Sequence, residues 1–165
     1  MKKFVSVILI AITAVLILAS CKTEPTAPTY ADNIAADTVM ASAGKSVASF
    51  DTLSKTDDMY FEYMVKAKKD DVDSYEIKLQ PNGTTLDEVG ILKARTDTVD
   101  SVKQSITAYL ADRNAAWTGL YLTEEYPKLK NAEVRVYGNY VVYAILSDSE
   151  KTAFFQAAEK AVTAK

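Results

Sequence analysis

The sequence predicts an α+β fold, in which helices pack on one face of a four-stranded, mostly antiparallel sheet. Three stretches of the chain support this prediction. Residues 74–80 alternate apolar and polar side chains, as a half-buried strand does. Residues 99–117 carry apolar side chains at three- and four-residue steps, which is the period of a helix. Residues 133–146 contain two apolar runs around Gly138-Asn139, a pair typical of a two-residue hairpin turn.

The first half of the domain is predicted to contain two helices and two strands. Residues 30–43 include good helix formers and an apolar stripe, and Gly44 would then end the helix in a left-handed conformation. Residues 59–69 place apolar side chains on one helical face, with acidic residues ahead and lysines at the end. A strand is the alternative there, because its aromatic and β-branched residues also favour one. A turn at 81–83 then leads to a more central strand at 88–94.

The second half is predicted to be helix, hairpin and helix. Asp97 or Thr98 would cap the helix at 99–117, and Gly119 would end it. If Tyr137 lies opposite Tyr140 in the hairpin, one of its faces is expected to be the core. That face carries Val134, Val136, Val141, Tyr143 and Ile145.

A capping box predicts the last helix. Ser147 and Glu150 have the spacing in which each side chain bonds to the backbone of the other residue. An apolar stripe follows, and we expect it to pack on the sheet: Phe154, Ala157 and Ala161.

The N-terminal segment predicts export from the cytoplasm. Lys2 and Lys3 precede an almost unbroken apolar run at 4–18, and small residues follow it. As a helix this run would reach only about 22 Å, short of the ~30 Å hydrocarbon core of a bilayer. We therefore interpret residues 1–20 as a signal peptide.

The only cysteine of the chain, Cys21, follows this segment directly. The sequence LASC at 18–21 resembles the bacterial lipobox, whose cysteine receives a diacylglyceryl group and becomes the first residue of the mature chain. Two acyl chains hold a protein on a membrane far more firmly than one does. We expect Cys21 to be lipidated and to anchor the protein at the extracytoplasmic face of the cell membrane. An ordinary cleaved signal with a stray cysteine and an uncleaved membrane helix are the alternatives.

The rest of the chain divides into a tether and one domain. Residues 21–29 are rich in proline and threonine, which favours a semi-extended spacer. Residues 30–165 are enough for a single domain with a sizeable core, and they contain no further linker or repeat.

Composition excludes several classes of function. The chain has 19 basic and 22 acidic residues, and removal of Lys2 and Lys3 with the signal leaves 17 against 22, a net charge of −5. An acidic chain without a basic run is a poor binder of nucleic acid, so we expect no nucleic-acid partner. The absence of histidine excludes Cys/His zinc sites and any Ser-His-Asp relay. We expect no cofactor.

Part of the domain resembles a known family. The resemblance rests on EVGILKA at 88–94, on Tyr126-Pro127 and on NAEVRVYGNYVVY at 131–143, and it covers roughly residues 50–148. The family consists of bacterial surface lipoproteins, common in Firmicutes, and is described only as a domain of unknown function. The resemblance implies a surface lipoprotein without a known activity, so no functional residues can be carried over.

Two kinds of side-chain cluster are candidate sites. Four acidic residues could bind calcium, although their spacing differs from an EF-hand loop and a solvated turn explains them as well: Asp70, Asp71, Asp73 and Glu76. Trp117, Tyr121 and Tyr126 could form an aromatic platform for a glycan or peptide. The alternative is that these rings attach a loop to the core.

Two classes of function remain open. The first is a non-catalytic binding or envelope-assembly module for an extracytoplasmic protein, peptide or glycan. The second is a hydrolase or transferase that depends on carboxylates and tyrosines alone. The sequence favours the first, because it has no histidine and no nucleophile motif. Adjacent carboxylates such as Asp87-Glu88 also point apart on a strand or helix, so adjacency does not supply the facing pair that a glycosidase needs.

Overall fold

A five-stranded antiparallel sheet is the centre of the computed structural model, which describes residues 28–164. The α+β class is therefore confirmed, but the predicted number of four strands is wrong. The additional strand, β1, is two polar residues long and lies at an edge of the sheet. Two residues are too few to form a periodic pattern that would predict a strand. In spatial order the strands are β1 Ser54–Lys55, β2 Val72–Leu79, β3 Glu88–Ala94, β5 Tyr140–Ile145 and β4 Glu133–Tyr137.

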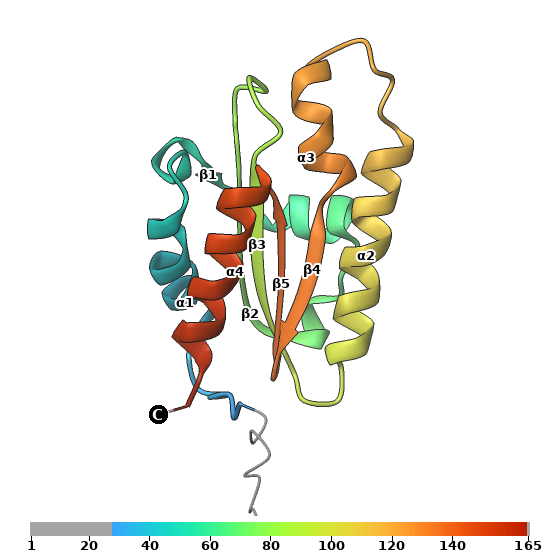
Figure 1. Cartoon of the computed structure of the whole chain (residues 1–165). Coiled ribbons are helices and arrows are strands. Elements are labelled where there is room, and N and C mark those ends of the chain that lie inside the picture. The colour runs from blue at the N-terminus through green and yellow to red at the C-terminus, as the bar shows by residue number, and fades with distance from the viewer. Residues whose placement is uncertain (1–27, 165) are drawn as a thin grey trace, which may run out of the picture.

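Helices cover both faces of this sheet (Figure 1). On one face lie α1 (Ala36–Ala43) and α4 (Asp148–Val162), which also pack on each other. On the other face lies α2 (Val99–Ala115), with the six-residue π-helix Tyr60–Val65 and the short α3 (Tyr126–Lys130) beside it. The prediction of helices on one face is therefore wrong.

The central strand explains why two layers of helices are needed. All six residues of β5 are buried. Val141, Tyr143 and Ile145 pack with α2, as the hairpin pattern predicts. Tyr140 and Val142 face the other way and pack with α1 and α4. The apolar content of this strand is continuous rather than alternating, and such a strand requires cover on both sides.

Most other elements match their predictions, with differences at the ends. The helix predicted at 30–43 begins only at Ala36. Gly44 has a right-handed backbone, with φ −59°, so the predicted left-handed helix end is wrong. A glycine is needed there because the Phe50 ring packs against it, and an added Cβ would meet that ring at 2.3 Å. The helix predicted at 59–69 is the shorter π-helix, which ends at the left-handed Lys66.

The capping signals are only partly confirmed. Thr98 is the N-cap of α2, but its hydroxyl donates to the carbonyl of Asp71 at 2.6 Å rather than capping the helix. Ser147 is the N-cap of α4, and its hydroxyl donates to the Glu150 carboxylate at 2.6 Å. The two predicted partners therefore bond to each other.

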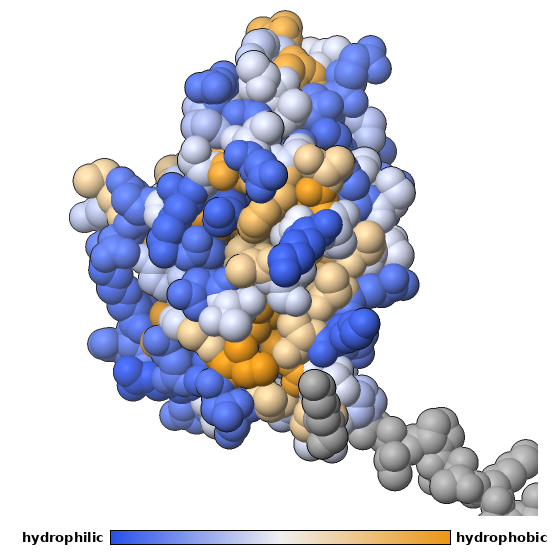
Figure 2. Space-filling model, turned by 90° about the vertical axis from the view of Figure 1, so that its left-hand side faces the viewer, coloured by the Kyte–Doolittle hydropathy of each residue, from blue (hydrophilic) through white to orange (hydrophobic). Residues whose placement is uncertain are grey.

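Both ends of the described chain lie at the same end of the domain (Figure 1). Tyr30 forms a β-bridge with Thr163, and the Ala31 amide donates to the Val162 carbonyl at 2.7 Å. The loops that join β2 to β3 and α2 to α3 lie at the opposite end. Figure 2 shows the α1 and α4 side, where polar surface surrounds apolar residues in the centre and toward the end with the termini.

Gly90 leaves room for the ring of Tyr143, which packs over it on the α2 face of the sheet. It lies opposite Tyr143 in the sheet, and a Cβ at this position would meet the Tyr143 ring at 2.0 Å. A side chain at residue 90 would therefore push the ring out of the core.

We predict that Gly90→Ala lowers the free energy of unfolding by about 2–3 kcal/mol, because the extra methyl overpacks a filled core. Urea unfolding of this variant and of Gly90→Ala in a Tyr143→Leu background would test it. With the ring removed, the added methyl should cost less than about 1 kcal/mol. An equal cost in both backgrounds would show that the ring is not the obstacle.

Candidate functional site

A buried carboxylate, that of Glu88, is the centre of the most elaborate polar cluster among the described residues. Glu88 is the first residue of β3 and is 1% exposed. Its Oε1 accepts hydrogen bonds from the hydroxyls of Tyr143 at 2.6 Å and Tyr109 at 2.8 Å. Its Oε2 accepts from the Tyr60 hydroxyl at 3.2 Å and from Nη1 of Arg113.

Ordinary features of the secondary structure bring these groups together. Tyr109 and Arg113 are four residues apart on α2, so they lie on one helical face, and Nη1 of Arg113 also donates to the Tyr109 hydroxyl at 3.0 Å. Tyr143 lies opposite Gly90, two residues beyond Glu88, so its side chain is on the same sheet face as that of Glu88. Tyr60 comes from the π-helix.

The cluster keeps its hydrogen-bond donors protonated. Burial, and after it the negative charge of Glu88, raises the pKa of Tyr60, Tyr109 and Tyr143 above the ordinary value. Burial alone would lower the pKa of Arg113, but Glu88 and the neighbouring tyrosines raise it instead. The three hydroxyls and the guanidinium are therefore donors to one carboxylate throughout the physiological range of pH.

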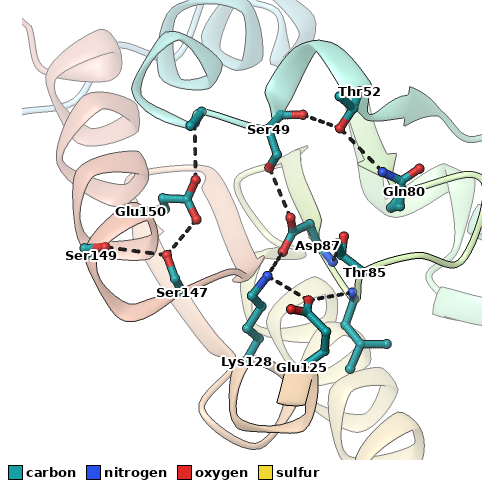
Figure 3. Close-up of polar contacts among 12 residues, drawn as sticks. Ser49, Thr52, Gln80, Thr85, Asp87, Glu125, Lys128, Ser147, Ser149 and Glu150 are labelled. Carbon is teal, nitrogen blue, oxygen red and sulfur yellow. Dashed lines mark hydrogen bonds and ion pairs between the residues drawn. The ribbon is translucent and has the colours of Figure 1, made fainter. Parts of the chain in front are cut away.

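The preceding residue, Asp87, organises a second network with other elements (Figure 3). Its carboxylate accepts from the Ser49 hydroxyl at 3.1 Å and pairs with Nζ of Lys128 on α3 at 2.7 Å. Lys128 also pairs with Glu125 at 2.7 Å, and Glu125 accepts the Leu86 amide at 3.2 Å. Burial lowers the pKa of Lys128, but its two acidic partners outweigh burial and raise it.

A small cleft opens between the β2–β3 loop and the chain that follows α2. Its volume is about 150 Å³, and both carboxylates and Arg113 contribute to its wall. Tyr121 spans the cleft, because its hydroxyl donates to the Gly83 carbonyl. The remaining lining residues are Leu79, Gln80, Thr85, Leu86 and Leu122.

The free groups in this cleft are suited to binding rather than to bond cleavage. The lone pairs of Glu88 are occupied by the three tyrosines and Arg113. Asp87 is held by Ser49 and Lys128. Nε and Nη2 of Arg113 donate no hydrogen bond to any residue between 28 and 164, and its side chain is 26% exposed. A guanidinium edge of this kind can receive a carboxylate or another small anion.

The structure separates the three aromatic residues predicted as a platform. Trp117 and Tyr126 stack on each other, with ring centroids 5.7 Å apart and planes 9° apart, and both pack against the core below α2. Tyr121 is 61% exposed and belongs to the cleft instead. Cys21, the signal peptide and most of the tether lie outside the described residues.

Three of the four acidic residues considered for calcium have other partners. Asp71 accepts from the Ser101 hydroxyl at 2.9 Å, Asp73 pairs with Lys93 at 3.1 Å and Glu76 pairs with Lys55 at 2.6 Å. Between residues 28 and 164, no three potential ligands converge on a metal position. No helix in that same range has the length and apolar content to cross a bilayer.

The sequence contains a signal for the Glu88 cluster that our sequence analysis did not use. Glu88 begins a mostly apolar strand, in which a buried acid requires partners. Tyr109 and Arg113 are four residues apart, on the same helical face of α2 as the buried Val102 and Ile106, and they bring polar groups to the end of that face. Nothing local to Tyr60 or Tyr143 indicates that they reach the same carboxylate.

We predict that Glu88→Gln lowers the free energy of unfolding by about 2–3 kcal/mol. Glutamine removes the counter-charge of the half-buried Arg113 and directs an NH₂ group at donors. Urea unfolding would measure the change, with Glu124→Gln on the exposed loop as the control, expected within about 0.5 kcal/mol of wild type. Equal effects of the two variants would contradict a structural role for the cluster.

Stability should also fall steeply in alkali. The pKa of the buried tyrosines is raised in the folded protein, so above about pH 10 the unfolded chain loses protons first and unfolding becomes more favourable. Each tyrosine contributes up to about 1.4 kcal/mol per pH unit. Urea unfolding at pH 8, 10 and 11 should give a slope that Tyr143→Phe makes shallower by about that amount. An unchanged slope would contradict the prediction.

Comparison with known proteins gives the family but no activity. Residues 46–146 match the family model described as a domain of unknown function (DUF4358). No match was found among curated proteins or among solved structures. The matched range includes all five strands, α2 and α3, and it leaves out α1 and α4. Because the match covers more than half of the chain, this protein belongs to the DUF4358 family.

Proposed function

We propose that this protein is a bacterial lipoprotein that acts as a non-catalytic binding or envelope-assembly module on the extracytoplasmic face of the cell membrane. A diacylglyceryl group on Cys21 would attach it to the membrane, and its partner would be an extracytoplasmic protein, peptide or glycan. The lipobox-like sequence LASC at 18–21 and the apolar run before it support the anchoring.

The observation that carries the binding role is the position of the cleft. The described chain starts at the end of the domain where Tyr30 pairs with Thr163, and the cleft opens between loops at the opposite end (Figure 1). A tether that leads to Cys21 would thus direct the cleft away from the membrane. The cleft offers the guanidinium edge of Arg113 to a small polar or anionic group of a partner.

The structure gives little support to the alternative of a carboxylate-dependent hydrolase or transferase. Such an enzyme needs one carboxyl group free to transfer a proton and another free to act as base or nucleophile. Asp87 and Glu88 both border the cleft, but each is held by cations and hydroxyl donors from other elements. Their partners favour a role in shaping the cleft.

Intact mass spectrometry of the protein purified from membranes tests the anchoring directly. We expect a chain that starts at Cys21 and carries a diacylglyceryl adduct. In a Cys21→Ala variant, the adduct should be absent and the protein should leave the membrane fraction. An unmodified wild-type chain would overturn the proposal that the module is lipid-anchored.

A further inference from the structure

The strand at one edge of the sheet, β4, has an unpaired side. The hairpin has a two-residue loop, so Tyr137 and Tyr140 form the hydrogen-bonded pair next to it, and the bonded pairs then alternate along the ladder. Arg135 consequently bonds to β5, whereas the N–H and C=O groups of Val134 and Val136 point outward. Within residues 28–164, these four groups have no hydrogen-bond partner.

A groove runs beside this edge. Its volume is about 380 Å³, and it lies between α2, the end of α3 and the start of β4. The floor is apolar and is formed by Leu110, Ala111, Leu129, Ala132 and Val134. Val134 and Val136 direct their side chains to this α2 side of the sheet, where they join the core under α2. An apolar side chain added next to β4 would therefore extend an existing core.

The rim of the groove is positively charged. Lys103 on α2 and Lys130 at the end of α3 are exposed and border it, and no acidic residue does. Neither lysine forms an ion pair with another residue of the described chain. The groove thus combines free backbone groups, an apolar floor and two unpaired cations.

We infer that β4 is a docking edge for an extended acidic peptide segment of a partner protein, which adds a sixth strand to the sheet. Residues of the peptide that pair with Val134 and Val136 would direct their side chains into the groove. An apolar residue there would cover the floor, and an aspartate or glutamate two residues away would reach Lys103 or Lys130. The inference deepens the proposed binding function and rests on it, since it names the partner as a protein segment.

A second copy of this chain is a poorer occupant of the same edge. On the α2 side, the β4 strand of a second copy would present Val134 and Val136, preceded by Ala132, and these residues offer no acid to the lysines. A symmetric pair of β4 strands would also bring the lysine rims of two copies together. Like charges in such positions oppose association.

Fluorescence polarisation with a defined peptide tests the inference on the full chain in detergent. The probe is fluorescein-labelled TDTVTDT, which places one valine and two aspartates on one side of an extended strand. We expect the double variant Lys103→Glu, Lys130→Glu to bind it at least about tenfold more weakly. The matched control is Lys160→Glu, an exposed lysine on α4, which should change binding less than about twofold.

Two further probes identify the mode of binding. The peptide TKTVTKT should bind the wild-type chain about tenfold more weakly than the acidic peptide, and it should prefer the double variant. Methylation of the central valine nitrogen should weaken binding by a similar factor, because it removes a ladder hydrogen bond. Amide hydrogen exchange should slow at Val134 and Val136 when the acidic peptide is added.

Three results would overturn the inference. The first is no binding of the acidic peptide below about 1 mM, and the second is equal affinity for the wild-type chain and the double variant. The third is a dimer in which the amides of Val134 and Val136 are already protected, which would assign the edge to a second copy. None of these three results changes the mass of the lipid adduct expected on Cys21. Failure of peptide docking at β4 can therefore be distinguished from failure of the proposed lipid anchor.

Discussion

The burial of one carboxylate constrains much of this fold. Glu88 is almost completely buried, and a buried charge is tolerated only when cations and hydrogen-bond donors surround it. Its donors come from the π-helix, from α2 and from β5, so three separate parts of the chain must reach the same point. Each of these segments also contributes to the core under α2. The polar cluster and the apolar packing around it therefore depend on each other.

The adjacent residue extends this constraint to other elements. Because successive side chains of an extended chain point in opposite directions, Asp87 and Glu88 contact different partners. Asp87 connects the segment around Ser49 with α3, whereas Glu88 connects β3 with α2. Two neighbouring acids thus connect the start of β3 to four elements, α2, α3, β5 and the π-helix, and to the segment around Ser49. The same contacts leave both carboxylates without the free oxygens that proton transfer requires, which is consistent with a binding role for the cleft.

The sequence predicts the regular elements of the fold well, because their signals are local. The bounds of β3 and of β4 agree with the prediction, and so does the hairpin turn at Gly138-Asn139. The strand β1 could not be predicted, because two polar residues carry no period. The prediction of helices on one face is wrong for a physical reason: an alternating pattern predicts one apolar face for β5, but the residues on its other face, such as Tyr140 and Ala144, are apolar too. The partners of Glu88 are brought together only by the tertiary fold.

The pairing of α1 with α4 has a consequence for how the chain reaches its native state. These helices are the first and the last regular elements of the described domain, and together they cover one whole face of the sheet. Until the fifteen residues of α4 are available, Tyr140 and Val142 lack the part of their apolar cover that this helix provides. A chain that leaves the ribosome from its N-terminus cannot close this layer before α4 has been made. Closure of this layer therefore has to wait until the last helix of the described domain has been synthesised.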